Sequence, residues 1–121
     1  MKTFRNLLLF AALFVAFSQT TFAANKFWIG PSGGNFGDNA NWSTTNGGAN
    51  NTTAPTSSDV AIFANGDVDN CSMSGSVTLQ GLTIQTGYSG TITMASSSTL
   101  TLTNTTTPLT IHQLRKSHPV P

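Results

Sequence analysis

The second half of the chain alternates apolar and polar positions in a short repeated element: an apolar residue, a threonine and another apolar residue. The element occurs five times, with intervals of 5, 10, 8 and 9 residues between successive starts. Its copies occupy residues 77–79, 82–84, 92–94, 100–102 and 109–111. Because neighbouring side chains of a strand point to opposite faces, each copy places two apolar groups inward and a threonine outward. The pattern predicts a stack of short strands, each with one apolar side.

Two further strands are expected before these triplets. Residues 59–63 are mostly apolar and predict the first strand, Asn65-Gly66 is a strong tight-turn dipeptide, and residues 68–73 can form the second strand. At Gln80-Gly81 the apolar positions change parity, which requires a turn or a bulge. Since no segment after the leader shows a helical period of apolar residues, the predicted class is all-β.

Two architectures fit the spacing of the triplets. Closely spaced strands joined by short connections can form antiparallel hairpins in a β-sandwich or meander. Alternatively, every second triplet is separated by a nearly constant step, from Leu82 to Leu100 and from Ile92 to Leu109, close to one turn of a short parallel β-solenoid of the β-helix kind. We favour the solenoid because similar triplets would stack as similar layers. An open stack leaves its last strand edge free for self-association with other chains.

The chain divides by composition into four parts. Residues 1–23 are a leader, 24–58 are rich in Asn, Gly, Ser and Thr and predict an irregular N-terminal cap around aromatic anchors, and 59–111 hold the strands. The tail 112–121 abandons the repeat and contains both histidines. Because a solenoid generally needs about three repeats and a cap, we expect the tail to mark a truncation and the chain to be a fragment of a longer protein.

The leader has the features of a helical secretory signal peptide. Lys2 and Arg5 form its basic start, residues 7–17 its apolar run, and Thr21-Phe22-Ala23 a small-residue cleavage site. The apolar run is shorter than the roughly 20 residues that a membrane-spanning helix needs. The leader therefore predicts a secreted or cell-surface protein without a membrane span after cleavage.

Charge and cysteine content narrow the function classes. After cleavage three basic residues stand against four aspartates, a net charge of −1, and the basic residues lie at opposite ends of the chain. A nucleic-acid partner is not expected, because such proteins concentrate positive charge on one surface. Cys71 is the single cysteine, so no intramolecular disulfide is available, and we expect it to be buried as a small apolar residue.

Candidate chemistry is sparse. Asp67 and Asp69 alternate on an extended segment and lie on the same side, where their oxygens could contribute to a Ca²⁺ site, but a solvated polar turn is favoured because calcium needs six to eight oxygens. The sequence has no Glu, and His112 and His118 lie in the tail, so no general base stands near a nucleophile. We predict no enzymatic activity and no cofactor.

Four aromatic residues have two interpretations. They could form a platform for sugar rings, which would give a carbohydrate-binding module, or they could close the end of the stack as a hydrophobic cap. We favour the cap, since a stack end must be covered. The four residues are Trp28, Phe36, Trp42 and Tyr88.

Taken together, an ordered set of short motifs resembles the opening segment of large exported bacterial surface proteins, of the adhesin-like or autotransporter-like kind with β-solenoid passengers. The motifs are Trp28, Gly33-Gly34-Asn35-Phe36, Asn41-Trp42-Ser43, Pro55, Asp59-Val60-Ala61-Ile62-Phe63, Gly81-Leu82-Thr83-Ile84 and Gly87-Tyr88-Ser89-Gly90-Thr91-Ile92. Phe36 stands where such segments more often have Trp. The resemblance implies a secreted structural or adhesive module whose partners would be surface glycans or host or matrix surfaces.

Overall fold

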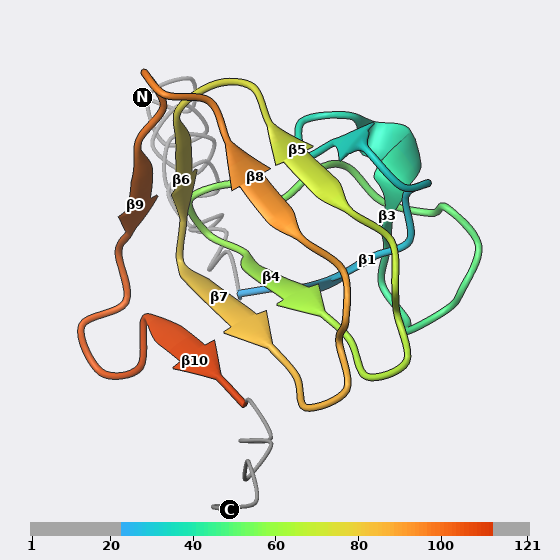
Figure 1. Cartoon of the computed structure of the whole chain (residues 1–121). Helices are drawn as coiled ribbons and strands as arrows, with labels where there is room; N and C mark the ends of the chain where they lie inside the picture. The colour runs from blue at the N-terminus through green and yellow to red at the C-terminus, as the bar shows by residue number, and fades with distance from the viewer. Residues whose placement is uncertain (1–22, 113–121) are drawn as a thin grey trace, which may run out of the picture.

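The computed structural model of the chain describes residues 23–112, which form an all-β fold (Figure 1). Within these residues the one helical element is the 3-10 turn η1 (Asn39–Asn41), so the predicted all-β class is confirmed. No helix in this range is long and apolar enough to cross a bilayer. The expected signal peptide, apart from Ala23, and the expected tail, apart from His112, lie outside the described residues.

Short strands make up the fold. Three strands precede Pro55: β1 (Asn25–Trp28), β2 (Gly34–Asn35) and β3 (Trp42–Ser43). Two follow it: β4 (Val60–Phe63) and β5 (Cys71–Met73). The remaining five contain the five predicted triplets: β6 (Val77–Leu79), β7 (Gly81–Ile84), β8 (Ile92–Met94), β9 (Leu100–Leu102) and β10 (Leu109–Ile111). The triplet prediction is confirmed, whereas the 24–58 region, expected to be irregular, contains three strands.

The strands lie in three sheets, with the orders β10-β7-β4-β1-β3, β2-β5-β8 and β6-β9. β4, β5 and β6 lie in the first, second and third sheet, and β7, β8 and β9 follow through the three sheets in the same order (Figure 1). Val60 pairs with Gly81 and Cys71 with Ile92, a separation of 21 residues in both sheets. Among the described strands, β1 and β3 form the one antiparallel pair.

Two expectations about strand pairing are wrong. Leu82 pairs with Leu109 rather than with Leu100, and Ile92 pairs with Cys71 rather than with Leu109. The reason is that three consecutive strands lie in three different sheets. A triplet therefore pairs with the triplet three places further along the chain, instead of two places further. The antiparallel hairpins of the alternative architecture are also wrong for β4 to β10, because each of these strands pairs in parallel with a strand three positions away.

Two connections of equal length, which we call corners, keep this separation the same in the β4–β7 and β5–β8 pairs. Residues 64–70 connect β4 to β5 and residues 85–91 connect β7 to β8, so the two corners are equally long. Gly66 (φ +84°) and Gly87 (φ +93°) hold equivalent places, and the Gly66 N–H donates to the Gly87 carbonyl at 3.3 Å. Only glycine adopts this backbone conformation without strain. The predicted Asn65-Gly66 turn is present, but it joins two sheets instead of two strands of a hairpin.

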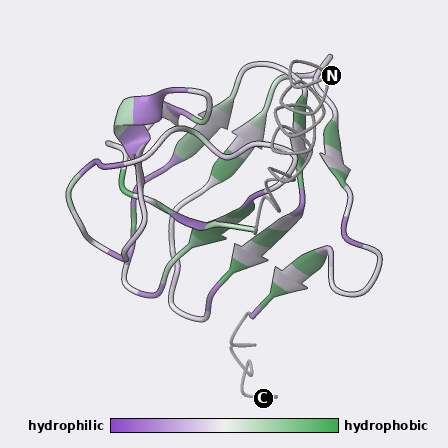
Figure 2. Cartoon of the chain, turned by 180° about the vertical axis from the view of Figure 1, so that it is seen from behind, coloured by the Kyte–Doolittle hydropathy of each residue, from purple (hydrophilic) through white to green (hydrophobic). Residues whose placement is uncertain are grey.

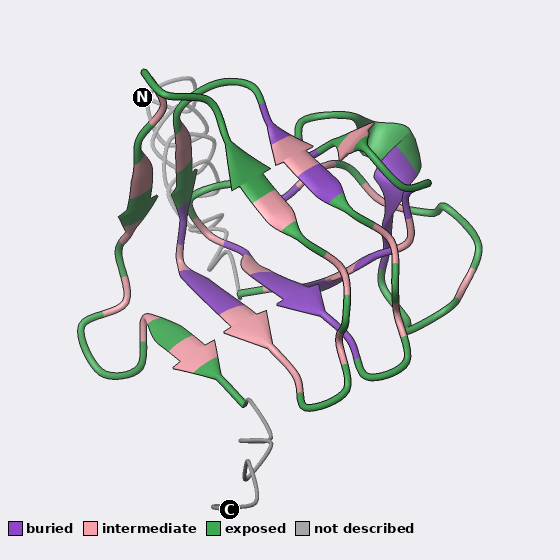
Figure 3. Ribbon diagram, viewed as in Figure 1, coloured by how far each residue is buried: buried purple, intermediate pink, exposed green. Residues whose placement is uncertain are grey.

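The core lies between the sheets and is filled most completely at the end nearest β1 and β3 (Figure 3). Cys71 is 1% exposed, which confirms its predicted burial. Burial, with a smaller effect of the Asp67 charge, raises the pKa of the Cys71 thiol to about 12. The buried apolar cluster consists of Trp28, Phe36, Trp42, Ala61, Phe63, Cys71, Met73, Leu79 and Leu82.

A buried ion pair joins β1 to the start of β4. Lys26 is on the same side of β1 as Trp28, and its Nζ lies 3.0 Å from Asp59 Oδ2. The ammonium also donates to Thr53 Oγ1 at 3.0 Å and to the Ala54 carbonyl at 3.3 Å. Thr56 donates to Asp59 Oδ2 through its backbone N–H and its hydroxyl, both at 2.8 Å. Each charge therefore has a partner and several hydrogen bonds, as buried ions require.

The Asp59 carboxyl has a lowered pKa. Burial acts to raise the pKa, but the hydrogen bonds from Thr56 and Lys26 and the Lys26 charge together outweigh burial. A lowered folded-state pKa means that the stabilisation is present above the unfolded pKa of about 3.9 and is lost as pH falls through the folded-state value.

We predict that Asp59→Asn lowers the free energy of unfolding at pH 7 by about 3 kcal/mol, because Lys26 remains buried without a counter-charge. The loss should shrink at acid pH, as the pH falls through the lowered folded-state pKa and the wild-type carboxyl itself becomes protonated. Urea unfolding at pH 7 and at a series of acid pH values measures both effects. Asp38→Asn is the matched control, because Asp38 is exposed and an amide oxygen can replace its cap to the Ala40 N–H. Equal losses in the two variants would contradict the prediction.

Candidate functional site

Three of the four aromatic candidates form a single interior cluster. The Trp28 and Trp42 ring centroids lie 5.3 Å apart at 75°, and those of Phe36 and Trp42 lie 4.8 Å apart at 69°. The Trp42 indole Nε1–H donates to the Phe36 carbonyl at 2.7 Å. Trp28, Phe36 and Trp42 are only 1%, 2% and 0% exposed. Their ring faces are covered by protein, so the sugar platform considered from the sequence is wrong for these three residues.

Tyr88, the fourth aromatic candidate, lies in the corner 85–91 at the edge of the cluster. Its ring packs on Phe63 at 5.2 Å, and its hydroxyl donates to the Asp69 carbonyl at 2.9 Å. Burial, together with the nearby negative charges of Asp67 and Asp69, raises the pKa of the phenol to about 12. Tyr88 also lines a cavity of about 510 Å³ between Ile84 and His112. Because its hydroxyl is hydrogen-bonded to Asp69, Tyr88 links the connection 85–91 to the connection 64–70.

The two acidic candidates lie in the corner 64–70, but they do not form a site of convergent oxygens. The Asp69 backbone N–H donates to Asp67 Oδ1 at 3.0 Å, which closes a local turn. Burial raises the pKa of Asp67, and the Asp69 charge raises it further, against an opposing hydrogen bond from the Asp69 N–H. Within residues 23–112 no group of three or more His, Cys, Asp or Glu side chains is placed to hold a metal ion. Two carboxylates fall well short of the oxygens that calcium takes.

A cavity of about 520 Å³ lies between this corner, Trp28 and the loop 46–50. Trp28 Nε1 and Asp67 Oδ2 belong to its lining residues, and in the described part of the chain both atoms are buried without a hydrogen-bond partner. An indole N–H and a carboxylate oxygen could together hold a hydroxyl group. Both atoms, however, lie beneath the cavity surface, so the cavity presents no formed polar subsite.

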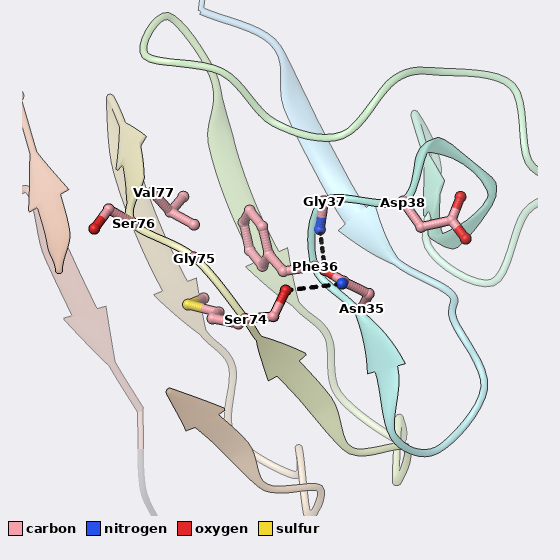
Figure 4. A pocket seen from close by; sticks show the side chains of 9 residues that line it. Asn35, Phe36, Gly37, Asp38, Ser74, Gly75, Ser76 and Val77 are labelled. Atoms are coloured by element: carbon pink, nitrogen blue, oxygen red, sulfur yellow. Dashed lines mark hydrogen bonds between the residues drawn. The ribbon is translucent and has the colours of Figure 1, made fainter. Parts of the chain in front are cut away.

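A second polar pocket, of about 470 Å³, lies between residues 35–38 and 74–77 (Figure 4). Asn35 Nδ2 donates to Ser74 Oγ at 2.9 Å, and the Gly37 N–H donates to Asn35 Oδ1 at the same distance. The Asp38 side chain points away from Ser74 and Ser76 (Figure 4). The serine hydroxyls therefore have neither a carboxylate nor an imidazole beside them in this pocket, and the arrangement lacks the nucleophile and base geometry of an active site.

The sequence alone did not identify Lys26 and Asp59 as a pair. In the charge pattern Lys26 is simply one of the basic residues of the mature chain. The signal was present in the alternation along β1, because Lys26 and Trp28 are two positions apart and share a face. If Trp28 points into the core, Lys26 does so too and needs a buried acid.

We predict that Asp67→Asn stabilises the protein at pH 7. A raised folded-state pKa means that the carboxyl group opposes folding as the pH rises above its unfolded-state pKa, and in full above the folded-state pKa. Asn keeps an oxygen to accept the Asp69 N–H. Urea unfolding of the variant and the wild type at pH 7 tests this, with 1 mM CaCl₂ added in a parallel series. Calcium should leave both unfolding midpoints unchanged, and a calcium-dependent rise in the wild type alone would contradict our description of this corner.

Comparison of the chain with protein-family models, curated proteins and solved structures finds no match. The resemblance to adhesin-like passengers therefore rests on the short motifs quoted above. Function has to be inferred from the strand pairing, the surface and the leader of this chain.

Proposed function

We propose that the chain is an exported structural or adhesive module of a bacterial surface or extracellular protein, built as a short parallel β-solenoid. The observation that carries this proposal is the in-register parallel pairing of β4, β5 and β6 with β7, β8 and β9. A solenoid adds layers of the same kind on top of one another, each layer contacting its neighbours only. Three sheets crossed in a constant order, with two equally long corners in equivalent places, are typical of that architecture.

The outward faces support a scaffold or contact role. Parallel register aligns Ser72 with Thr93, Thr78 with Thr101, and Thr83 with Thr110. The threonines belong to triplets in which they alternate with apolar residues, and Thr78, Thr93 and Thr101 are exposed. Rows of neutral hydroxyl groups can hydrogen-bond to polar surfaces such as glycans without attracting salt-dependent charged partners. The proposed partners are therefore surface glycans or matrix surfaces, contacted through these rows instead of through the buried aromatic rings.

Duplication of one layer tests the solenoid. A second copy of residues 60–80, inserted directly after Gln80, should add three parallel strands in register and give a folded protein. Because each layer covers its neighbour, the urea unfolding midpoint should stay equal or rise, and the β signal in circular dichroism should grow. A shuffled insert of the same length and composition is the control, since it lacks the inward and outward alternation. Loss of cooperative unfolding with the true duplicate, or equal tolerance of the shuffled insert, would refute the solenoid.

Export is tested by expressing the whole chain in a Gram-negative bacterium. We predict that residues 1–23 are removed and that intact mass shows a chain beginning at Ala24 outside the cytoplasm. Replacing Leu8 and Leu9 with Arg interrupts the apolar run and should abolish processing. Recovery of uncleaved wild-type chain in the cytoplasm would refute export while leaving the solenoid untouched.

A further inference from the structure

The chain contains two Asn-Gly dipeptides, and both stand in the middle of a tight turn. Asn46-Gly47 is in the connection between β3 and β4, and a backbone hydrogen bond of 3.1 Å closes the turn 45–48. Asn65-Gly66 is in the corner 64–70, and a similar bond of 3.3 Å closes the turn 64–67. Both glycines have the positive φ that this kind of turn requires, +64° in the first dipeptide and +84° in the second. In sequence and in turn geometry the two dipeptides are closely alike.

An Asn-Gly dipeptide carries a reaction of its own. The backbone nitrogen of the glycine attacks the side-chain carbonyl carbon of the asparagine, so a bond from this nitrogen to Cγ forms and the Cγ–Nδ2 bond breaks. Nδ2 leaves as ammonia with the proton of the attacking amide, and a cyclic imide remains. Water then opens one of the two C–N bonds of the imide and gives aspartate or isoaspartate. Glycine favours the reaction, because it has no side chain beside the forming ring and its backbone turns freely.

Contacts between the two corners hold Asn65-Gly66 away from this reaction. The Gly66 N–H, which must lose its proton before attack, donates to the Gly87 carbonyl at 3.3 Å. The Asn65 N–H donates to Gln85 Oε1 at 3.1 Å. The Asn65 amide oxygen lies so close to Gly87 that a Cβ on that glycine would collide with it. Attack therefore requires a hydrogen bond and a packing contact to open together.

Asn46-Gly47 has neither restraint. Among residues 23–112 no hydrogen-bond partner lies at the Gly47 N–H or at the Asn46 amide, and both residues are exposed. A Cβ on Gly47 would meet nothing within 4 Å. Open space alone does not separate the two sites, because the same is true of Gly66. The difference lies in the hydrogen bonds and in the seating of the asparagine side chain.

The loop that carries Asn46 is fixed at its base. The Thr44 N–H donates to Asn51 Oδ1 at 2.8 Å, and Asn51 Nδ2 donates to Thr44 Oγ1 at 2.9 Å. Asn50 Nδ2 also donates to the Trp42 carbonyl at 3.3 Å. The connection between β3 and β4 is coloured mainly from white to purple in Figure 2, since it contains few apolar residues. A polar tip with few contacts of its own opens locally at small cost, while the anchored base keeps the core undisturbed.

We propose that Asn46 is a site of spontaneous deamidation in the folded protein, whereas Asn65 is protected by its contacts with the corner 85–91. Asn46 and Gly47 line the cavity of about 520 Å³ that Asp67 and Asp69 also line. Conversion to aspartate or isoaspartate adds a third carboxylate to this lining, so the negative charge of this part of the surface grows with the age of the protein. The site follows from the contacts of the two turns and does not depend on export or adhesion.

The experiment follows both dipeptides in one purified chain during incubation at mildly alkaline pH, with and without denaturing urea. Cleavage after aromatic residues separates residues 43–63, with Asn46, from residues 64–88, with Asn65. Mass spectrometry detects the replacement of NH₂ by OH and locates it by fragmentation, and enzymatic methylation detects isoaspartate. In the folded chain Asn46 should react about tenfold faster than Asn65, because opening the hydrogen bond at Gly66 has to precede attack there. In urea the two rates should become equal.

Asn46→Gln identifies the reacting residue, and Asn65 serves as the internal control in the same chain. Gln keeps the amide but has to close a larger ring, so the mass gain in residues 43–63 should disappear while Asn65 reacts as in the wild type. Equal urea unfolding midpoints will show that the variant is folded. A mass gain in residues 43–63 that survives Asn46→Gln would overturn the proposal.

Three results with the wild type would also overturn it, whatever the variant does. The first is equal reaction of Asn65 and Asn46 in the folded chain, and the second is a difference that persists in urea. The third is an Asn46 that stays intact in the folded chain after it has reacted in urea.

Discussion

The fold depends on parallel strand pairing that keeps one side of every strand away from water. A shift of one residue in any pair would move an entire apolar row outward, because side chains alternate with a period of two. The equal connections that contain Gly66 and Gly87 keep the β4–β7 pair and the β5–β8 pair at the same separation of 21 residues. The third sheet pairs Val77 with Leu100, a longer step, since the connection before β9 is longer than that before β6.

Much of this was predictable from alternation alone. Each Thr-centred triplet became a strand. The burial of Cys71 was expected on another ground, because a free cysteine commonly packs as a small apolar residue. The number of sheets was not predictable in the same way. The short interval from Val77 to Leu82 crosses a sheet boundary through the single residue Gln80, whereas the interval from Ile92 to Leu100 crosses another through residues 95–99. Because the connections between strands differ in length, the spacing of the triplets along the sequence does not reveal which strands pair.

The structure of the N-terminal region was harder still to predict, since it depends on contacts between residues distant in sequence. β1 is held by β4, which begins long after β1 ends, and Lys26 is acceptable inside only because Asp59, Thr53 and Ala54 surround its ammonium. For the aromatic residues the sequence allowed two interpretations, a platform for sugar rings and the favoured hydrophobic cap. Their mutual edge-to-face packing at 4.8 to 5.3 Å decides for the core, and that packing is visible only in three dimensions.

The burial of Cys71 has a consequence for the proposed export of the chain to an oxidising compartment. Thiolate is the form that attacks disulfides and peroxides, and a thiol with a pKa of about 12 supplies almost none of it at neutral pH. The sulfur is also enclosed by the core, so small oxidants and partner thiols reach it only when the chain opens. A chain exported as proposed could therefore carry one unpaired cysteine without being drawn into mixed disulfides, and oxidation of Cys71 would report unfolding.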